Sequence, residues 1–192
     1  MDDSTIPIKT LSLSKEEQQF LKDLVRQSVE SYLVGETTWK DTAVPIPQST
    51  LLKEELGAFV TFSHNGNLRG CIGSVVGQGP LYLTVARMAR AAAFEDPRFP
   101  PITHEEFAAV DIEISIMGPI TPCFTPEKIE IGRHGLLIRK GQHSGLLLPQ
   151  VAPEWGWNRE QFLEQTCMKA GLPPTSWKDN DAQLYWFEAY VF

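Results

Sequence analysis

The sequence has few of the residues that build metal centres or disulfide frameworks. Its 192 residues include only three cysteines, Cys71, Cys123 and Cys167, and only four histidines. The cysteines are odd in number and far apart, which indicates neither a disulfide framework nor a zinc site of the CxxC type. No two histidines have the spacing of a metal site. We therefore expect no metal and no cofactor.

Excess positive charge and long apolar runs are also missing. The chain has 17 Lys and Arg residues against 24 Asp and Glu residues, a formal net charge of −7, which argues against broad binding to nucleic acids or anionic membranes. No apolar run reaches the ~18 residues of a membrane-spanning helix. The first residues, MDDSTIPIKT, resemble no signal peptide. These absences predict a cytoplasmic protein that binds no membrane.

The first half of the chain carries clear local signals for helices and strands. Ser14 and Glu17 form a capping box ahead of apolar residues at helical spacing, which predicts an amphipathic helix over residues 15–34. The dipeptide Asn65-Gly66 is a strong hairpin signal between two apolar segments. Further elements are expected as a short helix at 50–55, a helix at 81–95, a capped turn after Thr103 and a strand in DIEISIMG.

The second half repeats this order of elements. It is expected to contain a hairpin in HGLLIRKGQHSGLLLPQV, a helix over 159–170 capped by Asn158 and Gln161, and a strand in QLYWFEAYVF. We predict a tail over 1–14 and one domain over 15–192, with repeat units at approximately 57–118 and 134–192. The predicted fold class is α+β: a duplicated hairpin-helix-strand unit whose curved, mainly antiparallel sheet is flanked by helices. The two subdomains are expected to pack closely, with a ligand-binding cleft between them.

The segment from Leu68 to Gly73, LRGCIG, is an unusual strand because it combines an arginine, a thiol and two glycines. An arginine beside a cysteine can stabilise a thiolate. Glycines in a strand mark a bulge or the close approach of a backbone or ligand, and the pattern leaves both readings open. The thiol of Cys71 is either such a reactive group or a small core filler, since cysteine is often buried.

The hairpin register set by Asn65-Gly66 predicts pairs between His64 and Asn67, Phe62 and Arg69, and Val60 and Cys71. It places Arg69 and Cys71 on one face, turns Leu68 and Ile72 toward the core, and leaves His64 too far from Cys71 to act as its base. If the strand of residues 111–118 lies beside LRGCIG, the carboxylate of Glu113 could hold the Arg69 guanidinium. The catalytic candidates are Cys71 and Glu113, and the ligand-binding candidates are Arg69, Gly70, Gly73 and His134.

Five segments together resemble the AMMECR domain family. They are LRGCIGS, AAAFEDPRFPPIT, DIEIS, HGLLIRKG and GLLLPQVAPEWGWNREQFLEQTCMKAGLPP. The chain is most similar to bacterial and archaeal members that form protein A of the AmmeMemoRadiSam system, together with a Memo-like protein and a radical-SAM enzyme. The resemblance implies a duplicated α+β fold and those two partners. It implies no catalytic residue, because the family has no settled activity.

Two classes of function follow. In the first, the protein is an enzyme or enzyme subunit whose Arg69 and Cys71 line a cleft for a small or anionic substrate. In the second, it is a non-catalytic scaffold on which LRGCIG shapes a docking surface for the Memo-like or radical-SAM partner. Binding of nucleic acid through this strand and the tryptophans is disfavoured by the acidic composition.

Overall fold

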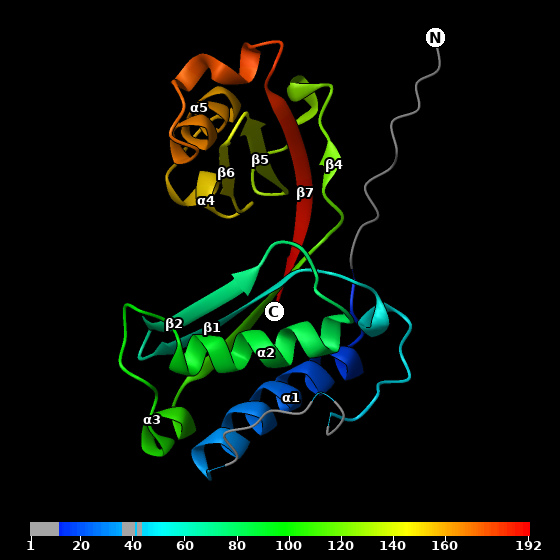
Figure 1. The fold of residues 1–192 in the computed structure, drawn as a ribbon, viewed down its shortest axis with the longest axis vertical. Helices are drawn as coiled ribbons and strands as arrows, with labels where there is room; N and C mark the ends of the chain where they lie inside the picture. Colours follow the sequence, from blue (N-terminus) through cyan, green and yellow to red (C-terminus); the bar gives the residue numbers. More distant parts are fainter. Residues whose placement is uncertain (1–11, 36–40, 42–43) are drawn as a thin grey trace. The chain divides into compact units, whose positions relative to one another are not determined.

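The computed structural model describes residues 12–35, 41 and 44–192 (Figure 1). Its contacts divide the chain into two compact units. We call Ser12–Met117 with Tyr190–Phe192 the N-terminal unit, and Gly118–Ala189 the C-terminal unit. Each is described by itself below. The predicted tail over 1–14 lies mostly outside the described residues, and the predicted domain bounds, the close packing of the halves and the cleft between them stay predictions.

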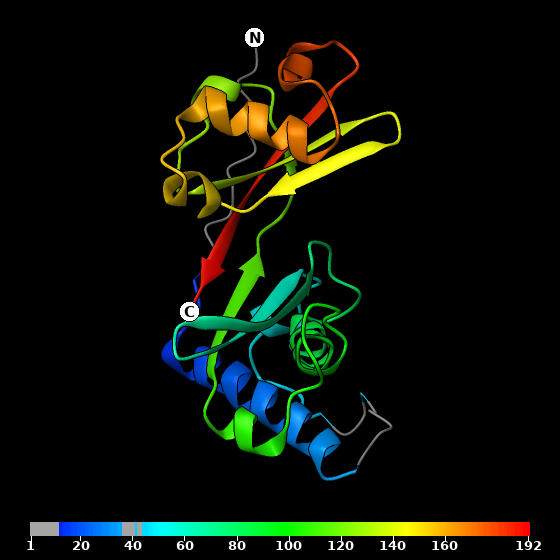
Figure 2. The same ribbon diagram turned by 90° about the vertical axis from the view of Figure 1, so that its left-hand side faces the viewer.

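The N-terminal unit has two long helices on one face of an antiparallel sheet. Its elements are α1 (Lys15–Leu33), η2 (Leu51–Lys53), β1 (Ala58–His64), β2 (Asn67–Ser74), α2 (Leu81–Phe94), α3 (His104–Ala108) and β3 (Asp111–Met117). Strand β1 lies between β2 and β3. Helix α2 packs against α1 and against both strands of the hairpin, and Figure 2 views α2 along its axis. The residues that β1 turns toward α2, Ala58, Val60 and Phe62, are fully buried, so this face carries the core.

Residues 190–192 complete the N-terminal unit although they come last in the sequence. The backbone N–H of Ile114 donates to the carbonyl oxygen of Phe192 at 3.0 Å, and the N–H of Phe192 donates to the carbonyl oxygen of Ile114 at 3.2 Å. In addition, the side-chain amide of Gln18 donates to the hydroxyl of Tyr190. The edge of β3 that faces away from β1 is therefore paired.

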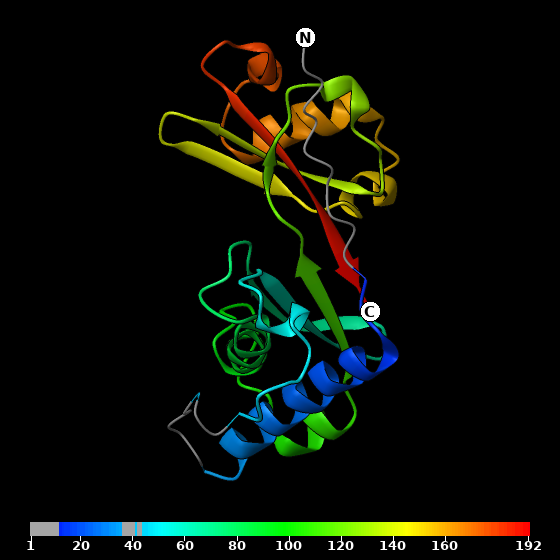
Figure 3. The same cartoon turned by 90° about the vertical axis from the view of Figure 1, so that its right-hand side faces the viewer.

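The C-terminal unit repeats the arrangement of strands. Its elements are β4 (Thr121–Pro122), η3 (Pro126–Lys128), β5 (His134–Lys140), β6 (His143–Leu147), α4 (Val151–Glu154), α5 (Arg159–Lys169), η4 (Pro174–Lys178) and β7 (Gln183–Val191). Strand β5 lies between β6 and β7, and β4 pairs with the other edge of β7. Helix α5 packs on β5 and β6 (Figure 3), where Phe162, Leu163 and Cys167 enter the core.

In both units the first strand of a hairpin therefore pairs with the last strand, and one helix covers the hairpin. The expected α+β class, the antiparallel sheets flanked by helices and the repeated hairpin-helix-strand order are confirmed.

Gly70 of β2 and Gly145 of β6 occupy matching positions in the two units. A Cβ on Gly70 would lie 2.2 Å from the carbonyl oxygen of Ala92, at the end of α2. A Cβ on Gly145 would lie 2.4 Å from the backbone nitrogen of Ala170, at the end of α5.

Three of the predicted helix starts, those of α1, α3 and α5, are confirmed and have a capping box. The side chains of Ser14, Thr103 and Asn158 accept from the backbone N–H three positions on, and the partner side chain at that position accepts from the cap backbone. The predicted helix at 50–55 is a single 3₁₀ turn, η2. Four short elements, β4, η3, α4 and η4, were not predicted, since two to five residues are too few to show a periodic pattern.

The predicted register of the first hairpin is correct next to the turn but wrong further along the two strands. His64 pairs with Asn67 as predicted, and Ser63 then pairs with Leu68, but the next pairs are Phe62 with Gly70 and Thr61 with Cys71. Arg69 has no partner in the ladder and forms a β-bulge. Because a bulge adds one residue to one strand, the alternation of faces beyond it differs from that of a regular hairpin.

The bulge changes which residues share a face with the Cys71 thiol. Val60 was expected on the face of Cys71, but it lies in the core and pairs with Ile72. Ile72 therefore faces the core side, as predicted. Leu68 was expected to be buried, but it is 43% exposed. The residue opposite Cys71 is Thr61.

Candidate functional site

Three polar side chains lie in a row across the face of the N-terminal sheet that points away from α2. Cys71 on β2 pairs with Thr61 on β1, and Thr61 pairs with Glu113 on β3. The hydroxyl of Thr61 donates to the sulfur of Cys71 at 3.3 Å. The Cys71 side chain is half-buried and Glu113 is exposed. We call Thr61, Cys71 and Glu113 the polar row.

Glu113 is not a direct partner of the thiol. Neighbouring strands are about 4.8 Å apart, so β2 and β3 are separated by about 10 Å with Thr61 between them. A proton that passes between Cys71 and Glu113 would need Thr61 or a water as an intermediate. The candidates Cys71 and Glu113 thus share a face, and their catalytic roles stay predictions.

The backbone of Cys71 is held from outside the sheet by Asp96 and Arg98. The N–H of Cys71 donates to the Asp96 carboxylate at 2.9 Å, and the Arg98 guanidinium donates to the Cys71 carbonyl oxygen at 3.2 Å. Arg98 also donates to both oxygens of Asp96, at 2.9 and 2.7 Å. These hydrogen bonds, together with that from Cys71, hold the pKa of the buried Asp96 carboxyl far below its ordinary value. The segment DPRFPP therefore covers the outer edge of β2, which fixes the backbone at Cys71.

Arg69 is neutralised by a carboxylate other than the expected one. Its guanidinium donates to both oxygens of Glu106 on α3, at 3.1 and 3.0 Å, and lies 5.9 Å from the centre of the Phe99 ring. Hydrogen bonds from Arg69, followed by that from the Thr103 backbone, lower the pKa of Glu106 to about 2. The expected partnership between Arg69 and Glu113 is therefore replaced by a bidentate pair between β2 and α3.

The two glycines of the motif each sit beneath a close neighbour within the unit. Gly70 faces the end of α2, where the Ala92 carbonyl oxygen leaves no room for a side chain. Gly73 lies under the ring of Phe59, since a Cβ there would lie 2.2 Å from a carbon of that ring. Both positions therefore have a packing reason, and their roles as ligand-binding residues stay predictions.

His134 belongs to the C-terminal unit and is occupied there. Its ring is buried, accepts a hydrogen bond from the backbone N–H of Glu130 at 3.0 Å and lies 4.9 Å from the Trp186 ring. Burial, followed by the nearby charge of Arg133, lowers its pKa. These contacts favour a neutral imidazole that packs inside its own unit. Its assignment as a ligand-binding residue stays a prediction.

The other thiols are buried. Cys123 and Cys167 both belong to the core of the C-terminal unit, and desolvation raises the pKa of Cys123 to about 11 and also raises that of Cys167. Among residues 12–35, 41 and 44–192, no three His, Cys, Asp or Glu side chains lie close enough to hold a metal ion together. In the same part of the chain, no helix combines the length and the apolar character needed to cross a membrane.

Sequence reasoning overlooked Thr61 and the role of Glu106. Thr61 was overlooked because the regular register placed Val60 opposite Cys71. The glycines of LRGCIG left a bulge open as one reading but did not show where it falls. Glu106 was recognised only as the third residue of a capping box, and its carboxylate does accept from the Thr103 backbone at 2.9 Å. The pairing of Asp96 with Arg98 was foreseeable, since the two residues stand two positions apart.

Comparisons with known proteins show the family to which the chain belongs. The AMMECR1 family model matches residues 22–192. A protein of Methanothermobacter thermautotrophicus is 40% identical over 191 residues, which cover 96% of this chain and 98% of the relative. A protein of Thermococcus kodakarensis is 44% identical over 184 residues, covering 91% and 88%. The crystal structure of an uncharacterised protein from Pyrococcus horikoshii has a TM-score of 0.81 and 39% identity, covering 93% of this chain and 92% of that one. The chain therefore belongs to the AMMECR1 family.

Proposed function

We propose that this protein is a non-catalytic binding component of a multi-protein modification system, and that the polar row is part of its docking surface. The partners proposed from the family resemblance are a Memo-like protein and a radical-SAM enzyme. The observation that carries the proposal is the bidentate pair between Arg69 and Glu106. Thiol activation by an arginine requires a cation whose charge is free to act on the sulfur, and here a carboxylate neutralises that cation.

The environment of the strand supports docking in a second way. Asp96 and Arg98 fix the backbone of Cys71 from the edge of the sheet, and α2 fixes it from the core side through Gly70. The remaining face presents an exposed carboxylate, a half-buried thiol and the half-buried ring of Phe59. A rigid strand that presents mixed polar and apolar groups suits recognition of a partner surface without a change of shape.

The first experiment measures association. The protein is co-purified with, and titrated against, a Memo-like protein and a radical-SAM enzyme of its own organism. Glu113→Lys reverses a charge in the polar row and is expected to weaken association at least tenfold, whereas Cys71→Ser has a mild effect. The matched control is Glu105→Lys, which makes the same charge change at an exposed position of α3 and should leave the affinity unchanged. Equal losses for both lysine variants, or no loss for either, would contradict docking through this face.

A cysteine-dependent enzyme is the second candidate, and the hydrogen bond from Thr61 to Cys71 favours it. A hydrogen bond donated to a thiolate stabilises the charged form. The pH dependence of Cys71 alkylation separates the two functions. A midpoint well below the ordinary thiol value of ~8.5, together with loss of activity in Cys71→Ser at unchanged stability, would establish the enzyme. A midpoint at or above that value supports the docking component.

A further inference from the structure

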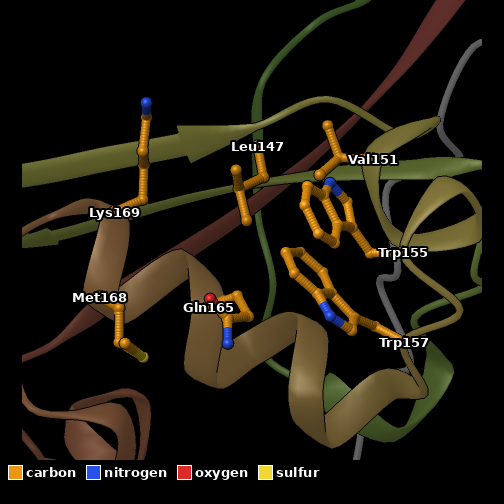
Figure 4. A pocket seen from close by; sticks show the side chains of 7 residues that line it. All are labelled: Leu147, Val151, Trp155, Trp157, Gln165, Met168 and Lys169. Carbon is orange, nitrogen blue, oxygen red and sulfur yellow. The ribbon is translucent and has the colours of Figure 1, made fainter.

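The C-terminal unit contains a cavity of about 650 Å³ that belongs to neither β2 nor the polar row. It is lined by residues of β6, the segment around α4, and α5: Leu147, Val151, Trp155, Trp157, Gln165, Met168 and Lys169. Figure 4 shows the two indoles one above the other at one side, Lys169 and Met168 at the opposite side, and Gln165 between them. This volume lies within the ~300–1,000 Å³ of small-molecule sites.

The tryptophan pair is built by the end of α4. The N–H of Trp157 donates to the carbonyl oxygen of Ala152, and the N–H of Gly156 donates to that of Pro153. Together with a φ of +66° at Gly156, these two bonds form a Schellman motif that stops the helix and turns the chain back. The two indole rings consequently stack with centroids 5.9 Å apart and planes 17° apart.

The two indoles differ in how they are supported. Trp157 packs against the core of the C-terminal unit, so its ring has a fixed place. Trp155 rests on Trp157 and is 69% exposed, and Met168 across the cavity is 53% exposed. An exposed indole on a rigid support is a platform on which a flat aromatic group can stack.

The polar groups of the cavity wall are mainly hydrogen-bond donors. Lys169 forms no ion pair, and Gln165 no side-chain hydrogen bond, with any residue that the structure describes. The indole N–H groups of Trp155 and Trp157 are likewise unpaired within the described part of the chain. A cationic ligand is disfavoured because the ammonium of Lys169 would repel it. A ligand that combines a flat ring with an anionic, acceptor-rich group matches both halves of this wall.

We propose that this cavity binds a mononucleotide, with the base stacked on Trp155 and the phosphate paired with Lys169. Gln165, which lies one turn before Lys169 on the same face of α5, is placed to read polar atoms of the base or sugar. The site is separate from the polar row, so it does not depend on the proposed docking function.

The experiment uses the whole protein and isothermal titration with AMP and GMP, with adenosine and inorganic phosphate as partial ligands. The nucleotides are expected to bind, adenosine to bind about tenfold more weakly, and phosphate not to bind measurably. Trp155→Ala and Lys169→Gln should each weaken AMP binding at least tenfold. Lys178→Gln is the matched control, because Lys178 also lies by a tryptophan, 4.7 Å from the Trp177 ring, but outside the cavity, and it should bind AMP like the unaltered protein.

Three results would overturn the proposal. The first is failure of AMP and GMP to bind at millimolar concentration. The second is binding that Trp155→Ala leaves unchanged, which would place the nucleotide elsewhere. The third is displacement of bound nucleotide by inorganic phosphate as effectively as by AMP. That result would mean that the site is only a lysine that attracts anions. Circular dichroism of each variant confirms that the fold is intact, and Trp155 and Lys169 are surface residues whose replacement leaves the core in place.

Discussion

Gly70→Ala tests the close approach of α2 to the strand that carries Cys71. The new Cβ would lie 2.2 Å from the Ala92 carbonyl oxygen, so strand and helix must separate by at least 0.8 Å (3.0 minus 2.2). The obstacle is the backbone of α2, so no flexible side chain can move aside to relieve the contact. The helix itself is held in place, because its residues Val85 and Ala89 are fully buried. Overpacking of this kind costs about 1–3 kcal/mol, and the lower unfolded-state entropy of alanine offsets about 0.5 kcal/mol.

We therefore expect Gly70→Ala to lower the free energy of unfolding by about 1.5 kcal/mol. The assay is urea unfolding followed by far-UV circular dichroism and by tryptophan fluorescence. Four of the five tryptophans, Trp155, Trp157, Trp177 and Trp186, belong to the C-terminal unit, so the fluorescence reports mainly on that unit. Gly145→Ala, the matching substitution there, should shift the fluorescence transition more than Gly70→Ala does.

The control for Gly70→Ala is Cys71→Ser, a substitution at the next residue on the opposite face. Because its side chain is half-buried and meets no backbone obstacle, we expect a change below about 1 kcal/mol. A loss of less than about 0.5 kcal/mol for Gly70→Ala would refute the reasoning, since it would mean that α2 yields at little cost. Equal losses for Gly70→Ala and Cys71→Ser would refute it as well.

Two further predictions concern charges and thiols. Glu106 has its pKa lowered from 4.5 to about 2 by Arg69, so its contribution to stability is complete above about pH 5 and is lost as the pH falls toward 2. Urea unfolding should show that the unaltered protein is more stable than Glu106→Gln at neutral pH, by at most about 1 kcal/mol for this partly exposed pair. This difference should disappear as the pH falls over that range, and a difference that grows in acid would contradict the prediction. Iodoacetamide should modify Cys71 in the native protein and spare Cys123 and Cys167, which peptide mass mapping checks, and modification of all three at equal rates would count against their burial.

Local signals were sufficient where a structure depends on neighbours in the sequence. The capping box of Ser14 and Glu17 and the turn at Asn65-Gly66 each involve residues within three positions, and both are present. The glycines of LRGCIG allowed a bulge, but its position at Arg69 could not be predicted in this way. It depends on the close approach of Gly70 to Ala92 of α2, 22 positions further on, and on the hydrogen bonds from Arg69 to Glu106, 37 positions further on.

The candidate site shows the same division. Cys71 was identified from its motif, but its neighbour Thr61 depends on the register, and the partner of Arg69 depends on where α3 lies. Glu106 and Glu113 carry the same carboxylate group, and only the placement of their backbones decides which of them pairs with Arg69. Residue type and pairs between near neighbours in the sequence could therefore be predicted, whereas pairs between distant residues could not.

The pairing of Ile114 with Phe192 has a consequence for how the protein is made. These residues are 78 positions apart (114 to 192), and the whole C-terminal unit lies between them in the sequence. During synthesis most of the N-terminal unit emerges before the C-terminal unit, yet the outer edge of β3 lacks its partner until residues 190–192 leave the ribosome. A nascent or truncated chain therefore exposes an unpaired strand edge. Removal of residues 190–192 should slow refolding and promote aggregation while most of the native secondary structure still forms.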